Sequence, residues 1–137
     1  MTWLLGLLVL VRPPVPGVTD PAVTQANIAQ TICQPGYTKT VRPPVSYTNR
    51  LKRKLYASRH LKGGLRAYEL DHLVPLEVGG APRDPANLWM EPIADARKKD
   101  RVENVAHRLV CSGRLSLADA QKAFETWGSK KSPIPAR

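Results

Sequence analysis

A bent stretch of extended chain, followed by one long helix, is the strongest constraint that the sequence places on the fold. Residues 66–78 alternate apolar and polar side chains imperfectly, carry Pro75 and run into Gly79-Gly80. A proline lacks the N–H that a central strand needs, so it favours a sheet edge or a bent hairpin. Residues 87–89 form a second short ordered segment. Residues 94–111 then repeat apolar side chains at helical spacing. The sequence therefore predicts a small α+β domain in which one helix crosses a bent hairpin.

Shorter elements are predicted on both sides of this unit. A short helix begins after Thr24 and ends at Cys33, and residues 37–41 form a short extended piece. A second helix covers 46–59, and Ser116 opens the last helix. Apolar side chains at helical spacing give the buried faces: Ile28 and Ile32 in the first helix, Tyr47, Leu51 and Leu55 in the second, and Leu117, Ala120, Phe124 and Trp127 in the last.

The length of 137 residues suits one domain. Residues 3–11 resemble the apolar part of an export signal, and a proline-rich stretch follows them. We therefore expect residues 1–20 to be a truncated signal-like segment and linker outside the fold. The domain is then 21–128, with its basic residues in the N-terminal half, and 129–137 form a flexible tail. A stray upstream translated segment is the alternative explanation for the first residues.

The two cysteines, Cys33 and Cys111, each stand at the end of a predicted helix. Neither belongs to a pair with the spacing of a zinc site. In an exported chain they are expected to form one disulfide. Closing a loop of about 79 residues would stabilise the fold by about 4 kcal/mol. Two buried free thiols in a cytosolic protein are the alternative.

The charge of the chain is strongly positive and unevenly distributed. The formal net charge is +10 at pH 7, and residues 21–68 contain no Asp or Glu. Such a chain favours a polyanion as partner, either nucleic acid or an anionic membrane surface. A merely solvated helix face is the alternative. No apolar run is long enough to cross a bilayer, so no stable membrane insertion is expected.

One short constellation carries candidate chemistry. Asp71 and His72 lie in the predicted hairpin, and Asn87 follows fifteen positions after His72. Histidine has an unperturbed pKa suited to taking a proton from water near neutral pH. Carboxylate and amide oxygens, such as those of Asp71 and Asn87, can hold a hard divalent cation. Because neighbours in a strand point to opposite faces, Asp71 and His72 can serve one phosphate only in a bent or wrapped-around site.

The string DHLVPLEVGG, followed by NLW and a helix, resembles the HNH endonucleases of the His-Me finger (ββα-metal) group. The resemblance implies a ββα-metal finger, a hairpin plus helix, wrapped by additional short helices. It assigns His72 as general base, Lys99 as a basic catalytic residue, and Asp71 and Asn87 as ligands of one Mg²⁺ or Mn²⁺ ion. Ala96 stands where many members carry a further histidine. The wider run 21–127 looks like small bacterial exported proteins with this motif, which implies a secreted or periplasmic protein.

The expected function is metal-dependent hydrolysis of phosphodiester bonds by an HNH-type endonuclease, with DNA favoured over RNA and little sequence preference. A set of basic side chains is expected to bind backbone phosphates: Arg42, Arg50, Lys52, Arg53, Lys54, Arg59, Lys98 and Arg101. The alternatives are a non-catalytic nucleic-acid-binding module on the same fold and a cationic exported effector that acts on anionic envelopes. For the site itself, the alternatives are that Asp71 and His72 form a satisfied core pair and that Asn87 starts a turn.

Overall fold

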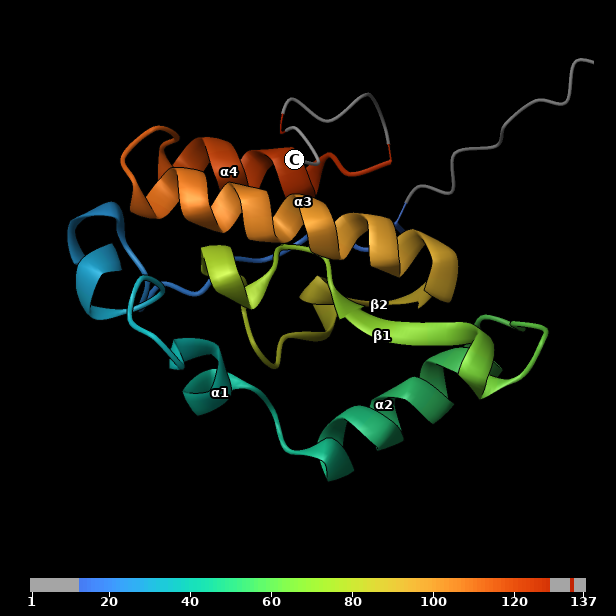
Figure 1. Ribbon diagram of the computed structural model, residues 1–137. Coiled ribbons are helices and arrows are strands. Elements are labelled where there is room, and N and C mark those ends of the chain that lie inside the picture. Colours follow the sequence, from blue (N-terminus) through green and yellow to red (C-terminus); the bar gives the residue numbers. More distant parts are fainter. Residues whose placement is uncertain (1–12, 129–133, 135–137) are drawn as a thin grey trace, which may run out of the picture.

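The structure is a computed structural model that describes residues 13–128 and residue 134 (Figure 1). Most of the signal-like segment, residues 1–12, lies outside the described residues. So does the expected tail at 129–137, apart from Ile134. Within the described chain, no helix combines the length and the apolar composition that crossing a membrane requires.

A two-stranded antiparallel sheet lies at the centre of the fold. Strand β1 (Tyr68–His72) pairs with β2 (Leu88–Pro92), and Asp71 stands opposite Trp89 in the register. These are the two strands of the only sheet in the described part of the chain, so the outer edge of each strand has no strand neighbour. The described part of the chain therefore has an α+β fold in which the paired strands are the whole sheet.

The chain between the two strands is compact and does not continue as extended structure. The extended segment expected at 66–78 stops at His72, because Pro75 precedes a 3-10 turn at Leu76–Val78. A second 3-10 turn at Pro85–Asn87 leads into β2. Gly80 is required in this loop, since a Cβ atom there would lie 1.7 Å from the carbonyl oxygen of Val74. The loop thereby returns the chain tightly to the edge of the sheet.

Helix α3 (Ile93–Cys111) crosses the hairpin, and α4 (Leu117–Glu125) packs alongside it (Figure 1). The expected long helix is confirmed. The expected cap of the last helix is confirmed as well, because the Ser116 hydroxyl accepts a hydrogen bond from the Asp119 amide at 3.1 Å. Buried side chains follow helical spacing on both helices. They include Val102, Val105, Ala106 and Val110 on α3, and Leu117, Ala120 and Phe124 on α4.

On the other side of the hairpin lie α1 (Tyr37–Val41) and α2 (Val45–Ser58), with a short 3-10 turn at Leu65–Ala67 (Figure 1). A further 3-10 turn at Gln25–Gln30 lies beside the start of α4, where the Leu117 amide donates to the Gln25 side chain at 2.8 Å. Residues 37–41 were expected to be extended, and that prediction is wrong. Gly36 adopts a left-handed φ of 81° that turns the chain into the helix, and the Arg42 amide still bonds to Thr38. Helix α2 has no fully buried residue, so its apolar stripe is only half-buried.

Residues 13–20 belong to the fold, contrary to the expectation that they form a linker outside it. The Gly17 amide donates to Ala86 at 3.0 Å, and the Asp20 amide donates to Gly79 at 2.8 Å. The Ala81 amide donates to the Val18 carbonyl at 2.8 Å. The loop between the strands offers backbone groups that need partners, and this segment supplies them.

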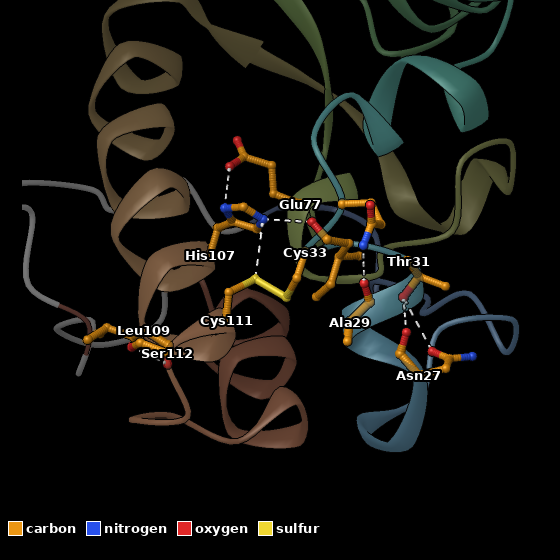
Figure 2. Close-up of a disulfide and its surroundings, with 11 residues drawn as sticks. Asn27, Ala29, Thr31, Cys33, Glu77, His107, Leu109, Cys111 and Ser112 are labelled. Carbon is orange, nitrogen blue, oxygen red and sulfur yellow. Dashed lines mark hydrogen bonds and ion pairs between the residues drawn. A yellow bond between two sulfur atoms is a disulfide. The ribbon is translucent and has the colours of Figure 1, made fainter.

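A disulfide joins Cys33 to Cys111, with a Cα–Cα distance of 5.7 Å, as expected for an exported chain (Figure 2). It fastens the segment after the first 3-10 turn to the last residue of α3. Beside it, His107 Nε2 lies 2.8 Å from the Ile32 carbonyl, and Nδ1 lies 3.8 Å from the Glu77 carboxylate (Figure 2). The end of α3 is thus held to the N-terminal segment by a covalent bond and by a hydrogen bond.

Candidate functional site at the free edge of the first strand

A polar cavity of about 90 Å³ lies at the edge of β1 that has no strand neighbour. Four consecutive residues of β1 line it, including both Asp71 and His72. Neighbours in a strand point to opposite faces, so the cavity must wrap around the strand edge. Its lining also contains Arg42 and a set of carboxylates, namely Glu69, Asp71, Glu77, Asp100 and Glu103. We call it the acidic cavity.

His72 is buried and held in one orientation. Its Nε2 lies 2.9 Å from the carbonyl oxygen of Pro82. A carbonyl oxygen only accepts hydrogen bonds, so Nε2 carries the hydrogen and Nδ1 keeps its lone pair. Burial lowers the pKa of His72 below the ordinary value, although the Pro82 carbonyl and Asp71 act in the opposite direction. His72 is therefore neutral at pH 7 and can take up a proton at Nδ1.

Lys99 joins the strand to the helix from inside the core. Its ammonium lies 2.9 Å from Asp71 Oδ2, 2.6 Å from Glu103 Oε1 and 2.9 Å from the His72 carbonyl. Burial opposes the charged form, but the two carboxylates outweigh it and raise the pKa of Lys99 above the ordinary value. Because the side chain is fully buried, its position lends no support to the expected catalytic role, which stays a prediction for Lys99. It is a positioning residue that fixes Asp71 and the backbone of His72.

Asn87 has no capacity left for a metal ion. Its Oδ1 accepts hydrogen bonds from the amides of Val74 at 2.9 Å and Val18 at 3.2 Å. Its Nδ2 donates to the carbonyls of Val74 and Ala81, each at 3.0 Å. The residue is fully buried and does not line the acidic cavity. In this arrangement Asn87 ties together the loop and the N-terminal segment, and its ligand role stays a prediction that these contacts do not support.

Of the acids at the site, the sequence pointed to Glu69 and Glu91 only as neighbouring or surface groups, and Glu103 and Asp100 were not singled out. Burial, followed by the nearby Asp71, raises the pKa of Glu103 to about 7 although Lys99 acts against this. Burial and neighbouring carboxylates also raise the pKa of Glu69 and Asp100. Glu103 stands one turn after Lys99, at the i,i+4 spacing of a helical ion pair, and this spacing is the signal that could have identified it.

Glu91 is the most deeply buried of these acids. It stands opposite Glu69 in the register and is 0% exposed. Neither of its carboxyl oxygens accepts a hydrogen bond from the described residues. Burial and the negative charge of Asp71 raise its pKa to about 9, so the carboxyl is neutral at pH 7. Such a group adds no charge to the site and can donate its own proton toward Asp71.

The donor chemistry of the acidic cavity suits a hard divalent cation. Among the described residues, no three His, Cys, Asp or Glu side chains converge closely enough to enclose an ion by themselves. Mg²⁺ and Mn²⁺ bind through one or two carboxylates and keep several waters, so a closed cage is not required. Among the five carboxylates that line the cavity with His72, those of Asp71 and Glu103 are held close to each other, because both contact the Lys99 ammonium, at 2.9 and 2.6 Å.

The expected phosphate-binding residues fall into two groups. Arg42 lines the acidic cavity, and Lys52 lines a larger groove beside it. Arg66, which was not predicted, lines the same groove. The remaining basic residues are exposed on α2 and α3, or just beyond the end of α2, and line neither cavity: Arg50, Arg53, Lys54, Arg59, Lys98 and Arg101.

The site thus combines a fixed histidine with a cavity lined by carboxylates. Comparisons with protein-family models, with curated proteins and with solved structures find no match for this chain.

Proposed function

We propose that the protein is a metal-dependent endonuclease of the HNH type, which hydrolyses phosphodiester bonds of DNA at the acidic cavity with little sequence preference. The observation that carries the proposal is the state of His72. Its imidazole is neutral, its Nε2 is fixed on the Pro82 carbonyl, and it opens onto a cavity lined by carboxylates. That is the arrangement required of a general base for water.

In the proposed reaction, Nδ1 of His72 accepts a proton from a water molecule, whose oxygen attacks the phosphorus in line with the leaving oxygen. Arg42 lines the cavity beside His72 and can bind a phosphate oxygen. Asp71 and Glu103 would hold the divalent ion. When bound, that ion supplies positive charge to the phosphate and to the leaving oxygen. Lys99 keeps Asp71 and the His72 backbone in place during the reaction.

Charge balance supports the requirement for a cation. Five carboxylates line the acidic cavity, against Arg42 in the lining and the buried ammonium of Lys99 behind it. A phosphate anion would be repelled from such a site, because like charges at short range interact unfavourably. A divalent ion bound to these carboxylates would offset the repulsion, so that a phosphate could lie next to His72.

We further propose that the protein works in an oxidising compartment, secreted or periplasmic in a bacterium. The disulfide between Cys33 and Cys111 supports this, because such bonds persist mainly outside the cytosol.

Nicking of supercoiled plasmid by the purified protein tests the nuclease proposal. We expect nicking with Mg²⁺ or Mn²⁺ and none with EDTA. His72→Ala should lower the rate by about 10²-fold or more, because a general base contributes that much. The matched control is His60→Asn, which removes an exposed imidazole that lines neither cavity.

Circular dichroism verifies that both variants are folded. A folded wild-type protein that nicks under none of these conditions contradicts the proposal, and so does a His72→Ala variant as active as His60→Asn. DNA binding without any cleavage would favour the non-catalytic binding module instead.

A further inference from the structure

A second cavity, of about 500 Å³, continues from the acidic cavity into the space between α2 and β1. The two cavities share Arg42, Glu69, Leu70 and His72 in their linings. We call the larger one the α2 groove, and the residues that matter for its chemistry are Arg42, Val45, Lys52, Arg66, Tyr68 and Ile93. A ligand whose phosphate lies beside His72 therefore extends into the α2 groove.

The α2 groove has the opposite charge to the acidic cavity. Arg42, Lys52 and Arg66 line it, and Glu69 is the one acidic residue among its lining residues. Arginine and lysine side chains are the usual partners of backbone phosphates. A polyanion can thus place phosphates along the α2 groove without a metal ion, whereas at the acidic cavity it needs one.

The walls of the α2 groove are apolar as well as cationic. Val45, at the start of α2, is 70% exposed, which is unusual for a large apolar side chain, and Ile93 and Tyr68 also line the groove. The Tyr68 hydroxyl donates to the Lys62 carbonyl at 2.9 Å, and the Tyr68 and Tyr56 rings pack edge to face with their centroids 6.2 Å apart. The aromatic wall is therefore fixed in place. Cationic grooves with apolar or aromatic walls are typical of sites that bind unpaired bases.

We propose that the α2 groove binds one unpaired nucleotide next to the scissile phosphate, so that the preferred substrate is single-stranded DNA. This inference rests on the proposed function, because it extends the substrate from the same site. In a duplex the faces of each base are covered by its neighbours, and a concave apolar pocket can take a base only when it is unstacked. The volume of the groove lies in the range of about 300–1,000 Å³ that encloses small ligands.

The test is binding in the presence of EDTA, where no metal-dependent cleavage occurs. Fluorescence anisotropy measures the affinity of the full chain for a labelled single-stranded oligonucleotide and for the duplex of the same sequence. We expect the single strand to bind about 10-fold more tightly at the same salt concentration.

Two variants probe the α2 groove, each with a control of equal charge change. Val45→Asp and Arg66→Ala should each weaken single-strand binding about 5- to 10-fold. Ala118→Asp and Arg114→Ala change exposed positions outside the groove and should weaken it less than 2-fold.

The outcomes separate the two proposals. Equal or tighter binding of the duplex overturns the inference, and so does a Val45→Asp variant that behaves like Ala118→Asp. Neither result decides the nuclease proposal, which the plasmid assay tests separately. Single-strand binding that depends on Val45 and Arg66 supports the inference even if no metal ion produces cleavage, in which case the nuclease proposal fails.

Discussion

The two sides of the hairpin are built differently. On the α3 side, charged groups are buried and paired, with Lys99 between Asp71 and Glu103 and the neutral Glu91 nearby. On the α2 side, no residue of the helix is fully buried, and a groove of about 500 Å³ remains between α2 and β1. The comparison indicates that the α3 side fixes the geometry of the site, whereas the α2 side leaves room for a ligand.

The largest effect is expected at Lys99. Lys99→Met leaves two carboxylates without their cation in the core, and breaking a buried ion pair in this way costs about 3–5 kcal/mol. The control is Lys98→Met, the exposed neighbour on α3, which should change the free energy of unfolding by less than about 0.5 kcal/mol. Urea denaturation measures both. If both variants lose a similar amount of unfolding free energy, the buried ion pairs do not stabilise the α3 side as we expect.

The disulfide at the end of α3 should contribute nearly as much to the free energy of unfolding as the ion pairs of Lys99 do. Replacing Cys33 and Cys111 together with serine is expected to lower the free energy of unfolding by about 4 kcal/mol, because the unfolded chain regains the freedom of a long loop. Comparing thermal unfolding of this variant with that of the reduced wild type separates the bond from the side chains. A loss below about 1 kcal/mol would show that α3 holds its N-terminal neighbour by packing alone.

Glu91 should make stability depend on pH. Its folded pKa of about 9 lies above the ordinary unfolded value, so folding takes up a proton. The stability that Glu91 contributes is therefore greatest below the unfolded pKa and is lost as the pH rises toward about 9.

Glu91→Gln keeps the shape of the neutral carboxyl and removes this titration. Measured in EDTA, the variant should gain stability over the wild type as the pH rises from 5 to 8, by roughly 1 kcal/mol or more. If the variant and the wild type differ in free energy of unfolding by the same amount at pH 5 and at pH 8, Glu91 is ionised in the folded protein.

The smallest effect is expected on the α2 side. Leu51→Ala removes a half-buried side chain and should cost about 1 kcal/mol, whereas Leu88→Ala in β2 removes a fully buried one and should cost about 3 kcal/mol. Because the chemical change is identical, urea denaturation of the pair compares the two sides directly. An equal loss would mean that α2 is as firmly packed as the sheet.

Local patterns predicted the regular elements well. The helices at 93–111 and 117–125, the Ser116 cap and the buried faces of both helices follow from apolar spacing and capping residues. The short helix at 37–41 was missed, because five residues carry too little periodicity to outweigh the proline pair that follows. Asp71 and His72, which the resemblance assigns to one site, line the same cavity.

The rest of the site could not be predicted, because it depends on distant contacts. Asn87 is engaged by Val18, Val74 and Ala81, and Lys99 is enclosed by β1 and by its own helix. A sequence shows that a side chain is polar but not which groups surround it. The proline-rich composition of residues 13–20 likewise predicts a linker, and only the structure shows their hydrogen bonds to the loop between the strands.

By itself, the sequence determined the long helix, the two paired strands and the adjacency of Asp71 and His72 in the chain, since these depend on residues close together in the sequence. Only the tertiary structure decided that Asp71 and His72 line one cavity, that Lys99 is buried, and that Glu103 lines this cavity whereas Asn87 does not. The physical reason is that burial, pairing and pKa depend on what surrounds a side chain. Those surroundings come from segments far apart in the sequence.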